Sequence, residues 1–293
     1  MTDGGGGVIS YSYAQNDMLV TVGPAPTGEN TKRKQLEYDG LGRLKSVCEI
    51  TASAGSGNCG QTVAQTGFLT RYTYDAQGNL LTVVQNAQSS STQTRTYTYD
   101  GLGRLLTEAN PETSGAAKSY TYDSDTTCGT SQGDQVKRVD AAGNVTCYAY
   151  DALHRDIAIT YPSGPNAAAT SPRYFVYDGA TVNSVAMANP KGRLAEAYTG
   201  PNTAKITDLG FSYSARGEVT DTYESTPRSG GYYQVSATYW ANGTLNTLLS
   251  NLAGLPHWTY TPDGEGRPYG VAASSGQNPL TSTAYNGLAR PQV

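Results

Sequence analysis

Two phrases of ten residues that share seven consecutive residues constrain the fold of this chain more than any other feature of the sequence. Residues 36–45 read LEYDGLGRLK, and residues 97–106 read YTYDGLGRLL. In the second copy Tyr and Thr alternate before the Asp, as in a β-strand. Asp is favoured at the first position of a type I turn and Gly at the fourth, where the backbone is left-handed. The phrase therefore predicts a tight β-hairpin with a bulge.

The hairpin fixes a register that the other copies must share. Tyr99 is expected to face Leu105, because cross-strand neighbours share a face of the sheet. The equivalent aromatic–aliphatic pairs are Tyr13–Leu19, Tyr38–Leu44, Tyr74–Leu80, Tyr213–Val219 and Tyr239–Leu245, with smaller residues in Val139–Val145 and Ala188–Leu194. Glu37 is expected to face Lys45 as an opposite-charge pair on the wet face. We interpret these pairs as the repeated core of the sheet.

The turn residues repeat with the same spacing. The turn Asp residues are Asp39, Asp75, Asp100 and Asp140, and the left-handed position is predicted for Gly42, Gly78, Gly103, Gly143, Gly192, Gly217, Gly243 and Gly266. Asp17 takes this position in the first copy, since Asp tolerates that backbone better than most residues. His154 and Ala289 depart from the pattern. We expect a longer loop at His154. At Ala289 we expect either backbone strain or a different turn.

Most successive turns are 23 to 26 residues apart, whereas Gly143 and His154 are 11 apart. A period of this length, filled by hairpins, is typical of a β-repeat array. The longer insertions, at residues 48–68, 85–95, 124–134, 162–173, 225–231 and 272–282, all lie away from the predicted turns. We therefore expect one uniform rim of tight turns and an opposite rim of variable loops.

Composition agrees with an all-β fold. The chain of 293 residues contains 23 Tyr against 3 Phe, with 34 Gly and 14 Pro to interrupt the strands, and no stretch has a sustained helical period. We predict a flexible Gly-rich lead at residues 1–9 and one continuous repeat domain at residues 10–293. The last residues begin a further copy of the phrase, so a fragment of a longer protein is expected.

The phrases LEYDGLGRLK, YTYDAQGNLL and YTYDGLGRLL resemble the YD repeats of the bacterial Rhs family, which also occur in toxin-complex C components, wall-associated contact toxins and teneurins. The resemblance runs from about Ser10 to the end. It implies a curved antiparallel sheet that spirals into a hollow shell around a C-terminal toxin or effector. The family's Asp-Pro-x-Gly self-cleavage motif does not occur here, so neither cleavage nor toxicity is assigned to any residue.

No sequence motif supports catalysis. His154 and His257 are the two His residues, and no metalloprotease, phosphate-loop or nucleophile-elbow motif is present. We therefore predict no enzyme activity and no cofactor.

Cation and nucleic-acid sites also lack support. Asp123 with Asp125, and Asp263 with Glu265, supply too few oxygens for a Ca²⁺ loop, so ordinary turns are expected there. The basic residues are scattered except at residues 32–34, and the net charge is −4. This pattern does not predict nucleic-acid binding.

The four cysteines leave two alternatives. Cys48 and Cys59 bracket one insertion, and Cys128 and Cys147 bracket the next irregular stretch, which suggests two disulfides. Two disulfides would indicate a secreted or cell-surface protein that is present in the cytoplasm before its export. Four free thiols in a cytoplasmic shell are the alternative. No apolar run is long enough for a membrane-spanning helix, and residues 1–10 are not a signal peptide.

Two functions remain open. The first is a structural segment of a shell that encloses and delivers a toxin, with further repeats or a capping domain as partners at the sheet edges. The alternative is a surface module that binds glycans through the variable loops, with Trp258 as a candidate aromatic residue.

Overall fold

The structure is a computed structural model that describes residues 7–25, 27–51 and 58–292. Within the described residues, twenty strands pair in one antiparallel sheet. The first half contains β1 (Val8–Ala14), β2 (Asp17–Gly23), β3 (Lys32–Tyr38), β4 (Leu44–Ile50), β5 (Gly67–Tyr74), β6 (Leu80–Gln85), β7 (Gln93–Tyr99), β8 (Leu105–Ala109), β9 (Ala117–Asp125) and β10 (Gly129–Val139). The second half contains β11 (Val145–Tyr150), β12 (Asp156–Ser163), β13 (Arg173–Tyr177), β16 (Leu194–Thr199), β17 (Thr207–Tyr213), β18 (Val219–Ser225), β19 (Tyr233–Tyr239), β20 (Leu245–Ser250), β21 (Trp258–Pro262) and β22 (Pro268–Ala273). The fold is all-β, as the sequence predicts.

Two short hairpins, β14 (Thr181–Val182) with β15 (Val185–Ala186) and β23 (Ala284–Tyr285) with β24 (Pro291–Gln292), stand outside the sheet. Within the described residues the helical segments are two single 3₁₀ turns, at Pro111–Thr113 and Ala167–Ala169. β1 begins at Val8, two residues before the predicted start of the array.

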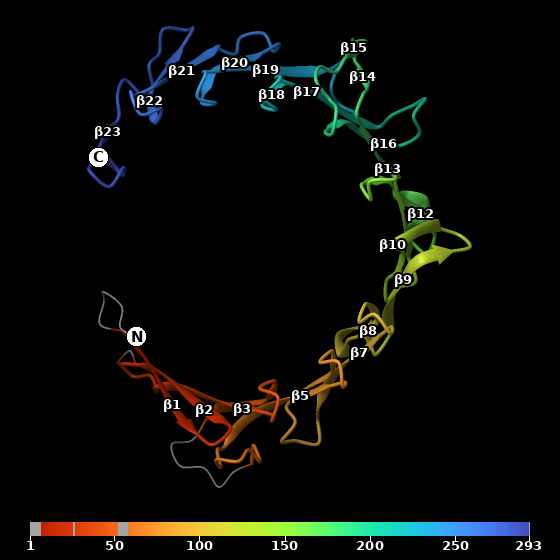
Figure 1. Cartoon of the computed structure of the whole chain (residues 1–293), viewed down its shortest axis with the longest axis vertical. Coiled ribbons are helices and arrows are strands. Elements are labelled where there is room, and N and C mark those ends of the chain that lie inside the picture. Colours follow the sequence, from red (N-terminus) through yellow and green to blue (C-terminus); the bar gives the residue numbers. More distant parts are fainter. Residues whose placement is uncertain (1–6, 26, 52–57, 293) are drawn as a thin grey trace. The chain divides into compact units, whose positions relative to one another are not determined.

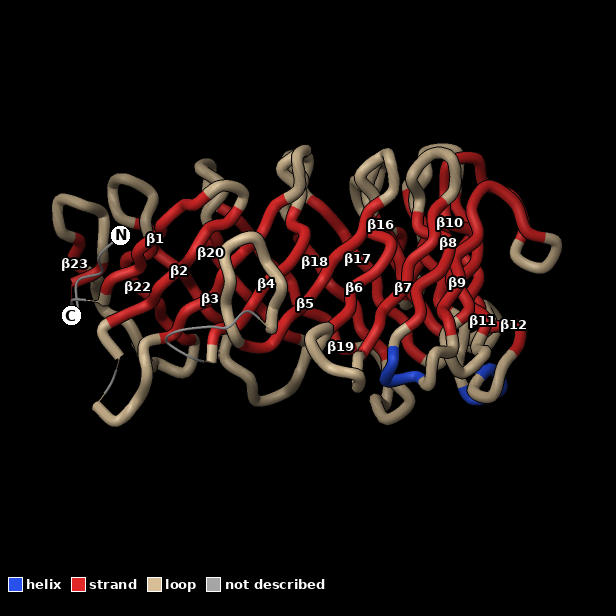
Figure 2. Tube along the Cα trace, turned by 90° about the horizontal axis from the view of Figure 1, so that it is seen from below, coloured by secondary structure: helices blue, strands red, loops and turns tan. Residues whose placement is uncertain are grey.

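The chain divides into two compact units, which we describe separately. Unit 1 comprises residues 1–122 and 137–144, and unit 2 comprises residues 123–136 and 145–293. In each unit the strands follow one another in chain order (Figure 1) and run between turns at one end and loops at the other (Figure 2). We call the end with residues 39–42, 75–78 and 100–103 the turn rim of unit 1, and the end with residues 151–154, 214–217, 240–243 and 263–266 the turn rim of unit 2. The opposite end of each unit is its loop rim.

The predicted hairpin register is present in most copies. The structure pairs Tyr38 with Leu44, Tyr74 with Leu80, Tyr99 with Leu105, Tyr213 with Val219 and Tyr239 with Leu245. In each case one extra residue follows the Leu or Val, so the register shifts between this pair and the next. This is the bulge that a three-residue turn requires.

The bulge corrects one expectation about charge. Glu37 pairs directly with Ser46, because Lys45 is the extra residue. The Lys45 ammonium still reaches the Glu37 carboxylate at 3.2 Å, but Glu37 is buried, so this face is not wet at Glu37.

The apolar clusters of the interior are small. One cluster in unit 1 contains Cys48, Cys59 and Leu69, and one in unit 2 contains Val182, Met187, Ala195 and Tyr223. Among the residues that the structure describes, nine polar or charged ones are buried as well, including Gln35, Glu37, Glu196 and Asp208. Buried polar groups are stable only when they are hydrogen-bonded. The packing of this sheet therefore depends on polar contacts that are specific in direction.

Candidate functional site

The tight turns are held by their Asp side chains. In the turn at residues 100–103, the Asp100 N–H donates to the Arg104 carbonyl and the Gly103 N–H donates to the Asp100 carbonyl, both at 3.0 Å. Asp100 Oδ1 accepts from the N–H groups of Leu102 and Arg104, and Oδ2 accepts from Arg104 Nε at 2.7 Å. The N–H and guanidinium of Arg104 lower the pKa of Asp100. The Asp thus stays ionised and closes the reversal with five hydrogen bonds within its own turn, two of its backbone and three of its carboxylate.

The left-handed position is occupied as the Gly pattern predicts, and also by two residues that depart from it. The φ angle is positive at Gly42, Gly78, Gly103, Gly143, Gly192, Gly217, Gly243 and Gly266. His154 and Ala289 adopt φ of 60° and 57° in turns of the same length, since each donates its N–H to the residue three before it. No longer loop forms at His154.

Several turns are also tied to the next hairpin through an Arg and a Tyr. The Arg43 guanidinium lies 5.0 Å from the ring centroid of Tyr74, and the Tyr74 hydroxyl donates to the Leu44 carbonyl at 2.9 Å. Arg43 Nη1 also donates to the Asp75 carbonyl in the next turn at 2.9 Å. We call the contact of the Arg guanidinium with the Tyr ring, together with the hydrogen bond of the Tyr hydroxyl, the Arg–Tyr link.

The link recurs in both units. It occurs at Arg104 with Tyr122, Arg193 with Tyr213 and Arg267 with Tyr285, and in each case the Tyr hydroxyl donates to the carbonyl of the residue that follows the Arg. Arg155 stacks on Tyr177 at 4.3 Å. Asn replaces the Arg at Asn79 and Asn144, and there the amide donates to the turn Asp. The sequence predicts the Tyr as a core residue of its own hairpin. Its ring and hydroxyl also bind the preceding turn, which was not predicted. The signal for this contact was the Arg that recurs directly before the second strand of a hairpin, in GLGR and EGR.

The first hairpin differs from the prediction. β1 and β2 are joined by two residues, Tyr13 pairs with Met18, and Leu19 pairs with Ser12. Gln15 has the positive φ, not Asp17. A two-residue turn has no bulge, so every pair after it shifts by one residue. Asp17 instead lies buried on the sheet face, 3% exposed.

The pair Ala188–Leu194 is also wrong. Leu194 pairs with Tyr177, and Asp178 is the turn Asp: its N–H donates to the Arg193 carbonyl and its Oδ1 accepts from the Gly192 N–H. Residues 179–191 are therefore an insertion within a tight turn, on the turn rim. The prediction that all insertions lie on the loop rim fails here, because the Asp and the Gly of one turn are separated by a segment with its own hairpin.

A second insertion of this kind follows Asp123, whose Oδ1 accepts from the Gly133 N–H at 2.7 Å. β9 and β10 extend through most of residues 124–134, which were predicted to be a loop. Because β10 leads away from the turn rim, the turn at residues 140–143 lies on the loop rim of unit 1. The spacing between Gly143 and His154 is only 11 residues because a single strand, β11, separates them. The two turns therefore lie at opposite ends of β11.

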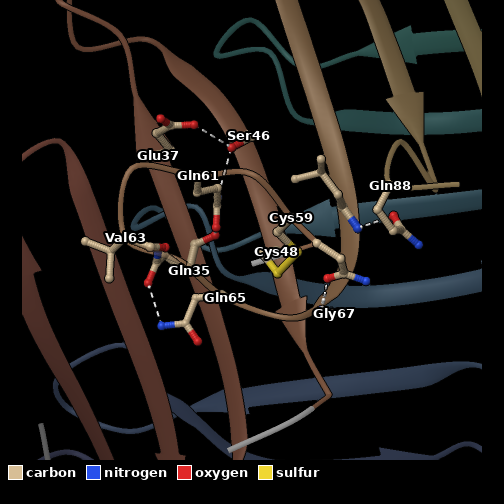
Figure 3. Close-up of a disulfide and its surroundings, with 12 residues drawn as sticks. Gln35, Glu37, Ser46, Cys48, Cys59, Gln61, Val63, Gln65, Gly67 and Gln88 are labelled. Atoms are coloured by element: carbon tan, nitrogen blue, oxygen red, sulfur yellow. Dashed lines mark hydrogen bonds between the residues drawn. A yellow bond between two sulfur atoms is a disulfide. The ribbon is translucent and has the colours of Figure 1, made fainter. Parts of the chain in front are cut away.

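The cysteines form two disulfides, Cys48–Cys59 and Cys128–Cys147. The first fastens residues 58–66, which we call the strap, to β4 in unit 1 (Figure 3). The second lies in unit 2 and joins the tip after β9 to β11. Cys48 and Cys59 are fully buried against Leu69, so the disulfide is part of the small apolar cluster.

The strap covers a row of polar side chains on β2, β3 and β4. Gln61 Nε2 donates to the Gln35 carbonyl and to Ser46 Oγ, at 3.1 and 2.8 Å. The Thr62 hydroxyl donates to Glu37 at 3.0 Å, and the Val63 N–H donates to Asp17 Oδ2 at 2.6 Å.

Further contacts hold the strap's ends. Gln65 Nε2 donates to Gln35 Oε1 at 3.1 Å, and the Gly67 N–H donates to Asn58 Oδ1 at 2.9 Å. The strap therefore replaces water over this face of the sheet.

The pKa values of the two carboxylates under the strap shift in opposite directions. Burial raises the pKa of Asp17, and the Val63 N–H offsets this only in part while the charge of Glu37 adds to it. Burial would also raise the pKa of Glu37, but hydrogen bonds from Thr62, Lys45 and Ser46 outweigh it and hold the pKa below its usual value. Glu37 is thus the ionised centre of the covered row.

Unit 2 has a comparable polar cluster. Lys205 binds both Glu196 and Asp208, and the Tyr232 hydroxyl donates to Asp208 Oδ2 at 2.6 Å. Burial raises the pKa of Glu196, with Lys205 offsetting part of the effect, and burial together with the Asp208 contact raises the pKa of Tyr232 to about 12. Beside it, Val182 of the inserted hairpin packs on Gly210, where a Cβ would lie 2.8 Å from the Val182 Cβ. A covering segment over a polar sheet face thus recurs in this unit.

The other candidate residues are engaged in local structure. His154 Nδ1 lies 2.7 Å from Asp134 Oδ2 on β10, and the His257 N–H donates to Ser274 Oγ. Asp263 binds Arg267, and Glu265 binds the same guanidinium.

Within the described part of the chain, no group of three His, Cys, Asp or Glu residues could hold a metal ion. No helix among the described residues is long and apolar enough to cross a membrane. Trp258 is not in a loop: it begins β21, paired with Leu248 and Ala273 and half-buried.

No protein-family model matches this chain, and no curated protein matches it either. Among solved structures, a crystal structure of TcdB2-TccC3-Cdc42 matches 97% of this chain at 12% identity with a TM-score of 0.45. The Tc holotoxin pore of Photorhabdus luminescens with a mutated TccC3 matches 97% at 13% identity and 0.44, and a porin-like protein from Bacteroides uniformis matches 94% at 10% identity and 0.27. This chain spans 18% of the length of each of the first two chains, and 93% of the third. The function has to be argued from the chain's own geometry.

Proposed function

We propose that this chain is a structural, non-enzymatic wall segment of an Rhs-like shell that encloses and delivers a polypeptide toxin or effector. The observation that carries the proposal is the Arg–Tyr link. In each linked pair of hairpins, one hairpin supplies the guanidinium and a free carbonyl, and the next supplies the ring and hydroxyl. Such a unit joins head to tail, so that a sheet built from it can be extended by further repeats.

The distribution of polar groups supports the same role. A domain that folds around one apolar core buries its large hydrophobic residues in one place, whereas this sheet has only small apolar clusters within the described residues. Turn Asp residues, Arg–Tyr links and covering segments stabilise it locally instead. A wall with two faces and no central core needs stabilisation of this kind, because each repeat contacts only its neighbours.

The partners and the location follow from this proposal. Further repeats or a capping domain would pair with the open strands of the sheet, since an unpaired strand edge attracts other strands. Two disulfides suit an oxidising compartment, which favours a secreted or cell-surface protein. The single continuous repeat domain at residues 10–293 remains part of the proposal.

Limited proteolysis of the natural protein that contains this chain tests the proposal. We expect any polypeptide encoded downstream in the same reading frame to resist proteinase K in the native protein and to be digested quickly when it is expressed alone. Equal rates of digestion would overturn the enclosing role. The surface-adhesion alternative, with glycans bound by the variable loops, remains a prediction, and binding on a glycan array would support it.

A further inference from the structure

A pocket of about 360 Å³ lies in unit 1 at the side of the strap. Its lining includes Glu37, Lys45 and Ser46 from the sheet, Arg71 from β5, and Gly60 from the strap. Figure 3 shows Glu37 and Ser46 beside the disulfide that fastens the strap. The volume is within the range of sites that bind small molecules.

Two of the hydrogen-bond acceptors that line this pocket, Glu37 and Ser46, are already in use. The Glu37 carboxylate accepts from Lys45, Ser46 and Thr62. Ser46 Oγ also accepts from Gln61. A ligand that enters the pocket therefore finds few acceptors on the protein.

The donors, in contrast, remain open. No hydrogen bond or ion pair of the Arg71 guanidinium is found within the described residues, although Arg71 pairs with Ser46 across the sheet. Lys45 uses one contact, to Glu37, and its side chain is 59% exposed. With Glu37 ionised, the two cations leave a net positive charge. The group that fits best is an oxyanion, since a guanidinium binds carboxylate or phosphate oxygens with two parallel hydrogen bonds.

The strap sets the distance between this guanidinium and the opposite wall. A Cβ at Gly60 would lie 3.6 Å from Arg71 Nη2, and Gly60 has a left-handed φ of +61°. Gly60 follows Cys59 directly, so the disulfide to Cys48 fixes this part of the wall. The pocket thus depends on the strap being fastened to β4.

We propose that this pocket binds a small organic oxyanion, a carboxylate or a phosphate monoester of about monosaccharide size, with Arg71 holding the head group and Lys45 adding charge. The proposal does not rest on the shell function. It assigns the strap a second role, as one wall of a ligand site.

Titration calorimetry on the purified chain tests it with three probes: galacturonate, glucose 6-phosphate and, as the neutral counterpart, galactose. We expect at least one of the two anions to bind and galactose not to bind, and the tighter of the two anions identifies the head group. Arg71→Gln should weaken binding roughly tenfold or more, because hydrogen bonds to charged groups are lost. Arg228→Gln, at an exposed Arg of unit 2, should leave it unchanged.

Two further variants keep the result interpretable. Lys45→Gln changes β4 and leaves β5 unchanged, and it should weaken binding of the anion. Cys59→Ser removes the disulfide that fastens the strap to β4, and it should weaken binding because the strap forms one wall of the pocket. The unfolding midpoint of each variant shows whether it is folded. Failure of both anions to bind the natural chain would overturn the proposal, as would undiminished binding by folded Arg71→Gln, or equal binding of galactose.

Discussion

Gly67 is the position at which the smallest chemical change should have the largest effect on the strap. It is the first residue of β5, and its N–H binds Asn58 at the start of the strap. A Cβ at this position would lie 2.0 Å from the carbonyl oxygen of Glu49 and 3.0 Å from the Cα of Ile50. The φ angle of Gly67 is not left-handed, so close approach of β4, not backbone strain, requires glycine here.

The magnitude follows from this overlap. Carbon atoms in contact are about 3.5–4.0 Å apart, so the added methyl would overlap the Glu49 backbone by about 1.5 Å. A backbone atom cannot rotate away, and β4 and β5 must separate where Ile50 pairs with Gly67. Overpacking of this kind costs about 1–3 kcal/mol, and one lost backbone hydrogen bond about 1 kcal/mol more. We expect Gly67→Ala to lower the free energy of unfolding by about 2–4 kcal/mol.

Urea unfolding of Gly67→Ala against Gly101→Ala measures the effect. Gly101 has no atom within 4 Å of its Cβ position and no left-handed φ, so its substitution should change stability by less than about 0.5 kcal/mol. Hydrogen exchange gives a local readout, because the Val63 N–H is bound to Asp17 only while the strap is seated. Equal midpoints for the two variants, with unchanged protection of Val63, would refute the reasoning.

Four other substitutions test the elements that hold the sheet. Cys59→Ser should cost up to about 3 kcal/mol in a reversible unfolding experiment, because it opens a loop of 11 residues, and natural protein and variant should become equally stable once both are reduced. Tyr122→Phe removes the hydroxyl of an Arg–Tyr link and should cost about 1 kcal/mol in urea, whereas Tyr97→Phe, which has no such link, should cost less. Gly103→Val should lower the melting temperature through at least about 1 kcal/mol of strain at a φ of +77°, and an unchanged melting temperature would exclude the turn assignment. The lowered pKa of Asp100 contributes stability that is present above the ordinary value of 3.8 and is lost as the pH falls through the folded pKa. Asp100→Asn should therefore lose less stability than the natural protein when the pH is lowered below 3.8, as measured by urea unfolding at a series of pH values.

Local chemistry made the hairpins predictable. The positions of Asp100 and Gly103 specify a turn by themselves, because the Asp binds N–H groups two and four residues away and the Gly accepts the left-handed backbone. The pair Tyr99–Leu105 follows from the turn length alone. Where the turn length differs, as between Tyr13 and Met18, the prediction fails for the same reason.

Interactions between distant residues were not predictable in this way. Asp178 and Gly192 belong to one turn although 13 residues separate them, whereas the predicted pair Ala188–Leu194 places the whole turn between those two residues. The Arg and the Tyr of the Arg–Tyr link both recur in the sequence, but they belong to different hairpins. Only the pairing of successive hairpins brings Arg43 to Tyr74.

The sequence by itself determined the repeat, the turn type, the hairpin register in most copies and the all-β class, since all of these depend on residues a few positions apart. The tertiary structure decided which face of the sheet is covered. Glu37 appeared to be a solvent-exposed residue in an alternating strand, and it is buried because Thr62, 25 residues away, lies over it. A strand pattern with period two distinguishes two faces but does not say what covers either, because that depends on where a loop closes and on the disulfide that holds it.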